Sequence, residues 1–167
     1  MRQVGAIIGF DFQPDPESER LLELVNKTNQ FNLNGVRYAQ ADWRDANART
    51  GAITVAVNYE DRYGPLGTIG VIQGRLEDRR LRVGIWVMSC RAFARRIEHQ
   101  CLKTLFEKTG AEEILFDFKL TARNAPMRTF LGQFLGVEPD SACAISRAEF
   151  ERICPQLYHQ VLELRRP

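Results

Sequence analysis

Three consecutive segments with the residue pattern of β-strands constrain the fold of this chain most. Residues 53–59, 68–72 and 81–88 are rich in β-branched and apolar side chains, and turn-forming residues separate them. The complete expected order is a strand at 4–12, helices at 17–28 and 41–49, the three central strands, a helix at 95–108, a strand at 113–120, a helix at 124–135, a strand at 142–145 and a closing helix at 150–164. Because neither repeats nor a linker composition interrupts this order, it predicts one α+β domain over residues 1–167.

The composition is that of an ordinary globular protein. Of the 167 residues, 44% are apolar and 26% are charged, and the net charge is +2. The chain has no basic stretch interleaved with aromatic residues, so we expect no nucleic-acid partner. Its four cysteines form no C-x-x-C pair and it has two histidines, so we expect no metal site. Without a secretory signal or an apolar run long enough for a membrane, the sequence predicts a cytoplasmic protein with reduced thiols and no membrane partner.

A thiol and several arginines follow directly after the third central strand. The apolar run Val83–Met88 leads to Cys90, and Arg91, Arg95 and Arg96 come next, where a helix is expected to begin. The positive end of a helix attracts anions and activates a neighbouring thiol as a nucleophile. This arrangement predicts a site for a phosphate-bearing thioester, such as coenzyme A or the phosphopantetheine of a carrier protein.

Four further arginines precede the same strand: Arg75, Arg79, Arg80 and Arg82. Together with the three that follow the strand, they predict a local basic patch on a nearly neutral protein. For the arginines near the turn at 77–80, a solvated hairpin tip is the alternative.

Residues around this strand end offer candidate catalytic groups. Cys90 is the candidate nucleophile, and its alternative role is that of a small buried apolar residue. Glu98 or His99, at the start of the following helix, is the candidate base. Cys101 lies on the apolar side of that helix and is expected in the core. We expect His159 at the surface.

The order of elements resembles that of the GNAT acyltransferase fold, and four motifs sharpen the similarity. Residues 28–33 read T-N-Q-F-N-L, a signature that resembles one of the FkbH-like family. Residues 61–71 resemble that family's D-R-F-G…G-x-x-G-V segment, residues 89–91 its S-C-R segment, and residues 119–126 its P-T-A-K-N-x-P segment. The resemblance implies a mixed central sheet flanked by helices.

The resemblance also implies a reaction and partners. FkbH-like proteins usually join a HAD-type phosphatase domain, which handles 1,3-bisphosphoglycerate, to a GNAT-like domain, and together these load a glyceryl unit onto an acyl carrier protein for polyketide assembly. No D-x-D-x-T motif of the phosphatase precedes Asn29, so the chain resembles the acyl-transfer half. A separate HAD-type phosphatase is therefore an expected partner, beside the acyl carrier protein.

In a GNAT fold, the thioester lies in a gap where the strand before the phosphate loop splays from the next strand. The phosphate loop of the CoA-dependent members reads R/Q-x-x-G-x-G/A, and the matching positions here are Arg91, Ala94 and Arg96. Arg91, Arg95 and Arg96 are thus the implied cofactor-binding residues. Because Arg96 adds bulk where a small residue is usual, the carrier's phosphopantetheine is favoured and coenzyme A stays possible.

Four amide side chains are candidates for substrate binding. Asn29, Gln30 and Asn32 either line a pocket for a short polar acyl group or form a helix-capping turn. Asn124 either contacts the ligand or caps the helix that follows it. The sequence therefore predicts an acyltransferase that moves a glyceryl-type group between thioesters through Cys90. A non-catalytic domain that docks a carrier protein and a CoA-dependent N-acyltransferase are the alternatives.

Overall fold

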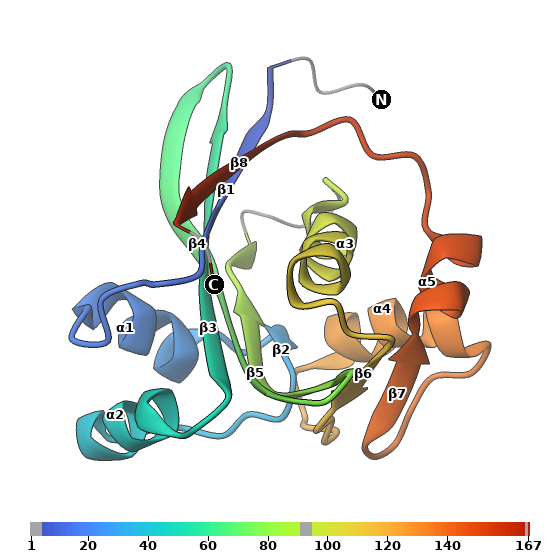
Figure 1. The fold of residues 1–167 in the computed structure, drawn as a ribbon, viewed down its shortest axis with the longest axis horizontal. Helices are drawn as coiled ribbons and strands as arrows, with labels where there is room; N and C mark the ends of the chain where they lie inside the picture. The colour runs from blue at the N-terminus through green and yellow to red at the C-terminus, as the bar shows by residue number, and fades with distance from the viewer. Residues whose placement is uncertain (1–4, 91–94, 166) are drawn as a thin grey trace.

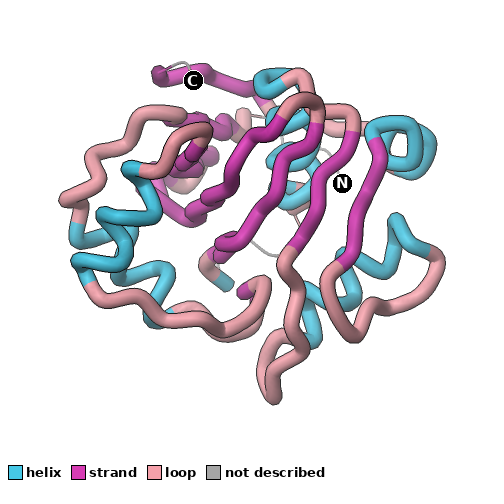
Figure 2. Tube along the Cα trace, turned by 60° about the horizontal axis from the view of Figure 1, so that its bottom comes forward, coloured by secondary structure: helices cyan, strands magenta, loops and turns pink. Residues whose placement is uncertain are grey.

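One mixed β-sheet runs through the molecule and carries helices on both faces. In the computed structural model, residues 5–90, 95–165 and 167 are described. The elements are β1 (Ile7–Asp11), α1 (Glu19–Lys27), β2 (Phe31–Asn32), α2 (Gln40–Ala48), β3 (Ala52–Asp61), β4 (Gly64–Glu77), β5 (Arg80–Met88), α3 (Ile97–Thr109), β6 (Glu113–Phe116), α4 (Ala125–Leu135), β7 (Cys143–Ser146), α5 (Arg147–Ile153) and β8 (Gln160–Arg165). The strand order is β7-β6-β5-β4-β3-β1-β8, with β2 paired to β5 off this path (Figures 1 and 2). This is the α+β architecture with a mixed sheet that the sequence predicts.

The centre of the sheet is the antiparallel set β3, β4 and β5, as the three strand patterns predict. Ladders join β3 to β4 and β4 to β5 along almost their whole lengths. Parallel pairs flank this set, β5 with β6 on one side and β1 with β8 on the other. The helices α1 and α2 cover one face of the sheet, whereas α3, α4 and α5 cover the other (Figure 1).

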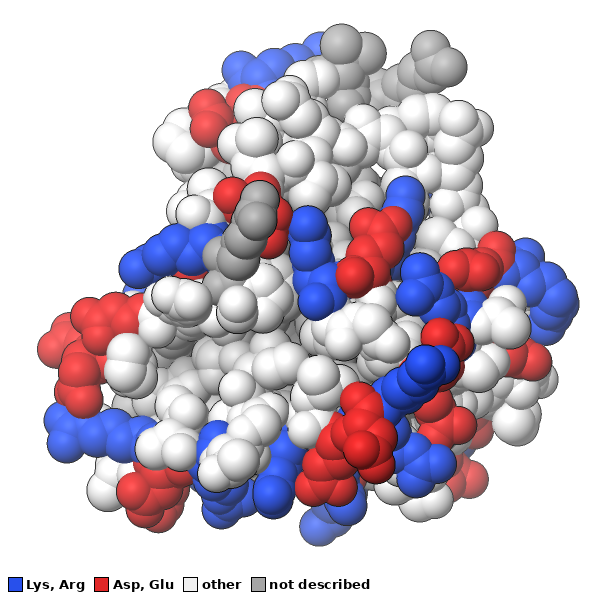
Figure 3. Space-filling model, viewed as in Figure 1, with Lys and Arg blue, Asp and Glu red and all other residues white. Residues whose placement is uncertain are grey.

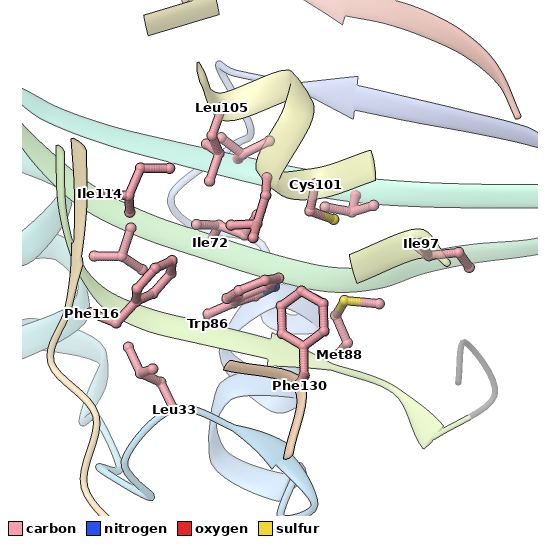
Figure 4. Close-up of a cluster of buried hydrophobic side chains, with 14 of the residues drawn as sticks. Leu33, Ile72, Trp86, Met88, Ile97, Cys101, Leu105, Ile114, Phe116 and Phe130 are labelled. Carbon is pink, nitrogen blue, oxygen red and sulfur yellow. The ribbon is translucent and has the colours of Figure 1, made fainter. Parts of the chain in front are cut away.

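Alternation of side chains along β5 builds a core on each face. Ile85 and Val87 pack in the smaller cluster with residues of α1 and α2, while Trp86 and Met88 pack in the larger cluster beneath α3 and α4. Trp86 is fully buried, and the ring of Phe130 on α4 meets it edge to face at 5.6 Å between centroids (Figure 4). The strand that leads to Cys90 is therefore fixed on both faces.

The partner of β5 changes along its length. From Arg80 to Val83 the strand pairs in parallel with β6. Farther on, β2 takes over in antiparallel pairing, with Phe31 opposite Met88 and Asn32 opposite Val87. Since β4 pairs with the same two residues of β5, β2 lies on the opposite side, where β6 has ended.

Two expectations about the C-terminal part and the 26–34 turn were wrong. The predicted closing helix at 150–164 is a short helix, α5, followed by the strand β8. The Ser146 hydroxyl caps α5 by accepting from the backbone N–H of Glu149, and Pro155 disfavours helix at the residue before it. Likewise, the segment predicted as a polar turn contains β2.

The predicted basic patch does not form one surface. Arg80 and Arg82 lie at the start of β5, whereas Arg95 and Arg96 follow its end, and a strand of this length separates the two groups by roughly 25 Å. Ion pairs join Arg80 to Glu113 at 3.0 Å and Arg82 to Asp117 at 3.0 Å. Figure 3 shows acidic and basic side chains interspersed over the face that it presents.

Candidate functional site

A groove of about 570 Å³ lies between α1 and the end of β5. Its lining residues are Arg20, Glu23, Leu24, Lys27, Thr28, Asn29, Gln30, Phe31, Met88, Ser89 and Cys90. The structure therefore brings together three residues that the sequence predicted for the site, the thiol of Cys90 and the amides of Asn29 and Gln30. Cys90 is exposed, so the alternative role of a buried apolar residue does not hold for it.

Backbone contacts fix the strand end that carries Cys90. The N–H of Ser89 donates to the carbonyl of Ile69 at 2.7 Å, which extends the contact between β5 and β4 past the end of the ladder. Beside it, Phe31 packs on Trp86 at 5.1 Å between ring centroids and is 2% exposed. The groove is thus lined by a buried aromatic ring packed in the core as well as by the exposed Cys90.

The wall of the groove on α1 carries charges of both signs. Glu23 lies 3.8 Å from Arg20 and 3.6 Å from Lys27, and all three side chains are about half exposed or more. Arg20 also donates to the backbone carbonyl of Thr68 at 3.2 Å. With two cations and one carboxylate, this wall suits a small anionic group rather than a cation.

Arg37, which no motif in the sequence marks, holds the end of α1. Its guanidinium donates to the carbonyls of Val25 at 2.7 Å and Thr28 at 3.0 Å, and to the side-chain oxygen of Asn29 at 2.5 Å. It therefore satisfies carbonyls that a helix end leaves without partners, and it orients the Asn29 amide. Because this contact depends on the path of the loop, no local pattern in the sequence reveals it.

Asn32 and Asn124 lie away from the groove and hold the backbone. Asn32 is 3% exposed, donates to the carbonyl of Thr28 at 2.9 Å, and accepts from the backbone N–H of Asn34 and Gly35. Asn124 is fully buried and donates to the carbonyls of Asn32 at 3.0 Å and Lys119 at 2.9 Å. For these two residues the contacts favour a structural role over substrate binding.

Glu98 and His99 do not line the groove. His99 is 7% exposed, packs against the rings of Phe130 and Phe134, and lies 3.3 Å from the side-chain oxygen of Gln133. Burial lowers the pKa of His99 and raises the pKa of the Glu98 carboxyl above its usual value. Although Glu98 Oε1 is 3.7 Å from His99 Nδ1, burial favours the uncharged form of both groups, which argues against an ion pair.

Arg95 and Arg96 are held by contacts within the chain. Arg95 pairs with Asp61 at 3.2 Å and lies over the ring of Tyr59, while Arg96 donates to the carbonyl of Gln156 at 2.8 Å. His159 Nε2 donates to the backbone carbonyl of Arg95 at 2.7 Å. Arg91 lies outside the described residues, so the predicted phosphate-binding set stays a prediction.

These contacts identify residues that sequence reasoning missed. The ring of His159, which we expected at the surface, is half buried, and burial lowers its pKa. Asp61 belongs to the D-R-Y-G segment, but the motif did not indicate that Asp61 pairs with Arg95. Together with Tyr59, whose pKa burial raises, these residues clamp the turn that precedes α3.

Within the described part of the chain, no three His, Cys, Asp or Glu side chains gather in a way that would hold a metal ion. Nor does any helix of those residues have the length and apolar character needed to cross a membrane.

Comparison with solved structures identifies the fold. A domain from Methanocaldococcus jannaschii DSM 2661 matches with a TM-score of 0.61 and 11% identity, over 84% of this chain and 99% of that one. A chain of the NatC complex bound to Gag peptide and CoA matches with a TM-score of 0.54 and 13% identity, over 83% and 98%. The aminoglycoside acetyltransferase AAC(6')-Ib in complex with coenzyme A matches with a TM-score of 0.53 and 14% identity, over 87% and 98%.

The chain therefore has the GNAT acetyltransferase fold, as predicted. Neither a scan against protein-family models nor a search of curated proteins finds a match, so affiliation with the FkbH-like family stays a prediction.

The residues of this chain do not fit coenzyme A in the manner that the fold implies. The gap in which a GNAT thioester lies is the region where β5 has lost β6 as a neighbour. Here that side of β5 is paired with β2, and Leu33 and Asn34 continue the contact. Among the described residues, this edge of β5 is therefore occupied by the chain itself from Val83 to Met88.

Proposed function

We propose that this chain is an acyltransferase that carries a short polar acyl group on Cys90 between two thiols. One observation carries the proposal: the exposed thiol of Cys90 and the amides of Asn29 and Gln30 line a single groove. The fold, shared with an aminoglycoside acetyltransferase whose structure holds coenzyme A, supports acyl transfer as the type of reaction.

The chemistry is a pair of thioester exchanges. The Cys90 thiolate attacks the carbonyl carbon of an incoming acyl thioester, a tetrahedral oxyanion forms, and the donor thiolate leaves. The acyl-Cys90 thioester is then attacked by the acceptor thiolate, which restores the Cys90 thiolate. Each exchange replaces one C–S bond and one thiolate with another, so no net proton transfer is needed. The protein's task is alignment of the thiols and stabilisation of the oxyanion.

The amides favour a hydroxylated acyl group. Asn29 is held through Arg37, and Gln30 is exposed on the same groove, so both can form hydrogen bonds to hydroxyl groups. The FkbH-like motifs suggest a glyceryl unit, supplied with the help of a HAD-type phosphatase and carried on the phosphopantetheine of an acyl carrier protein in polyketide biosynthesis.

One observation favours a second function. Neither Glu98 nor His99 lines the groove, and burial favours their uncharged forms. The two predicted bases therefore do not lie beside the thiol, which is compatible with a non-catalytic role in which the groove docks a carrier protein and presents it to another enzyme.

Intact-protein mass spectrometry separates the two functions. The protein is incubated with an acyl carrier protein that carries a glyceryl thioester. If the chain is an acyltransferase, its mass increases by one glyceryl group, and peptide mapping places that group on Cys90. The Cys90→Ala variant gains none, while Cys101→Ala gains the same mass as the unsubstituted protein. Binding of the carrier without any adduct on the unsubstituted protein would support the docking function instead.

A further inference from the structure

On the side of β5 that faces away from β4, the carbonyls of Val83, Gly84 and Trp86 all accept hydrogen bonds from other parts of this chain. Asp117 N–H donates to the carbonyl of Val83 at 3.0 Å, where β6 ends. Next along the strand, the carbonyl of Gly84 accepts from the Asn34 amide at 2.9 Å, and the carbonyl of Trp86 accepts from the N–H of Leu33 at 3.0 Å. The β2 ladder completes the series. We call residues 31–34 the seal.

The seal is built into the core. Leu33 is fully buried and lies in the same cluster as Trp86 and Phe116 (Figure 4). Its carbonyl accepts from the N–H of Lys119 at 3.1 Å, so the seal joins β5 to the segment that follows β6. Asn124, itself fully buried, donates to the carbonyl of Asn32.

Opening the gap would be costly. Removing the seal would expose the side chains of Phe31 and Leu33 and leave the carbonyls of Gly84 and Trp86 without their partners. An arm inserted in the gap would need to replace each of these contacts. The groove beside α1 reaches Cys90 without displacing these contacts, because Phe31 is the one residue of the seal among its lining residues.

We propose that the thioester arm reaches Cys90 along the groove beside α1, and not between β5 and β6. This inference rests on the proposed function, in which an acyl thioester reacts at Cys90. The ligand is a pantetheine 4′-phosphate arm. Thr28, Asn29 and Gln30 offer hydrogen bonds to its amides, and Arg20 and Lys27 offer positive charge to its phosphate.

A labelling experiment tests the route without using catalysis. The probe is pantetheine 4′-phosphate whose thiol is replaced by a chloroacetamide, so that the Cys90 thiolate displaces chloride and becomes alkylated. The readout is the rate of Cys90 alkylation by the probe divided by its rate with iodoacetamide, which is small enough to reach Cys90 by any route.

Two variants separate the routes. Gln30→Trp adds bulk to the groove at an exposed position, and we expect it to lower the rate ratio about tenfold. Asn34→Ala loosens the seal without touching the groove, and we expect no change in the ratio. Thermal unfolding checks that both variants are folded. If Asn34→Ala does not fold, Gln30→Trp alone still tests the route, because a substitution at this exposed position leaves the fold intact.

The opposite pattern overturns the proposal. A ratio that rises in Asn34→Ala and is unchanged in Gln30→Trp would place the arm in the gap. The same chloroacetamide on coenzyme A and on a carrier protein distinguishes the two sources of the arm. If the rate ratio falls in Gln30→Trp with either probe, the result supports the groove and identifies that source. If the ratio falls with neither probe, the result contradicts the proposed route.

A failure of the proposed covalent mechanism can be distinguished from a failure of the proposed route. If Cys90 is alkylated along the groove but Cys90→Ala still transfers acyl groups, the covalent mechanism is wrong and the route is right.

Discussion

The groove beside α1 and the seal are built from one short stretch of chain, yet they differ in almost every property. Thr28, Asn29 and Gln30 line the groove and are at least partly accessible, whereas Asn32 and Leu33 are buried and hydrogen-bonded to the core. The same T-N-Q-F-N-L signature therefore serves two purposes. The change occurs at Phe31, where the chain joins β5 as the strand β2.

This difference shows that the role of an asparagine or glutamine side chain, in substrate binding or in structure, depends on its burial and its hydrogen-bond partners. An accessible amide can exchange water for a ligand at small cost, so it can select a substrate. A buried amide whose donors and acceptors are satisfied within the protein fixes the backbone, and a ligand would have to displace those contacts. Substitutions on the two sides should consequently affect different measurements.

The largest expected effect is on the groove side. Cys90→Ala removes the candidate nucleophile and should abolish acyl transfer, with little change in the free energy of unfolding because Cys90 is exposed. Cys101→Ala is the matched control: that thiol is fully buried, so transfer should persist while unfolding becomes easier by about 1 kcal/mol. Full transfer by Cys90→Ala would contradict the covalent mechanism.

On the buried side, Asn124→Ala should destabilise the protein strongly. It leaves the carbonyls of Asn32 and Lys119 and the N–H of Thr121 without their partner, at a cost of roughly 3 kcal/mol in the free energy of unfolding. Chemical denaturation measures this directly. A loss below about 0.5 kcal/mol, the size usual for an exposed substitution, would mean that the seal is not held as described.

The substitution Glu98→Gln tests whether Glu98, at the start of α3, is a buried core residue or a catalytic base. Its pKa in the folded protein is raised by burial, so the folded state is favoured when the carboxyl is protonated, and stability is lost as the pH rises from the ordinary value of 4.5 through the raised one. Glu98→Gln should therefore unfold at a higher temperature at neutral pH, and the difference should vanish in acid. If the variant is instead equally stable and loses acyl transfer, Glu98 acts as a catalytic base.

Local signals in the sequence predicted much of this fold. The central strands and the helices expected at 95–108 and 124–135 were predicted correctly, because the periodicity that marks them depends on neighbouring residues. The strand β2 was missed because it has two residues and is defined by its pairing with a distant strand. The strand β8 was missed because apolar residues at 161, 162 and 164 also suit a helix.

The site was predictable to a similar degree. A thiol after an apolar strand pointed to Cys90, and the signature pointed to Asn29 and Gln30. The burial of Asn32 and Asn124, the pairing of Asp61 with Arg95 and the position of Arg37 all depend on contacts between distant segments. No pattern of neighbouring residues encodes such contacts.

The smallest expected effect on stability, and the sharpest on selectivity, concerns Asn29→Ala. The side chain is partly accessible and accepts a hydrogen bond from Arg37 at an exposed position, so the free energy of unfolding should change by about 0.5 kcal/mol or less. Transfer should change in preference instead. With glyceryl, lactyl and propionyl thioesters on one carrier, the unsubstituted protein should favour glyceryl, because an apolar acyl group leaves amide groups without partners at roughly 1–3 kcal/mol each. Asn29→Ala should narrow that preference. If the three substrates react equally with the unsubstituted protein, or if the variant alters stability and not preference, then Asn29 only caps the end of α1, and the contrast between groove and seal is one of exposure alone.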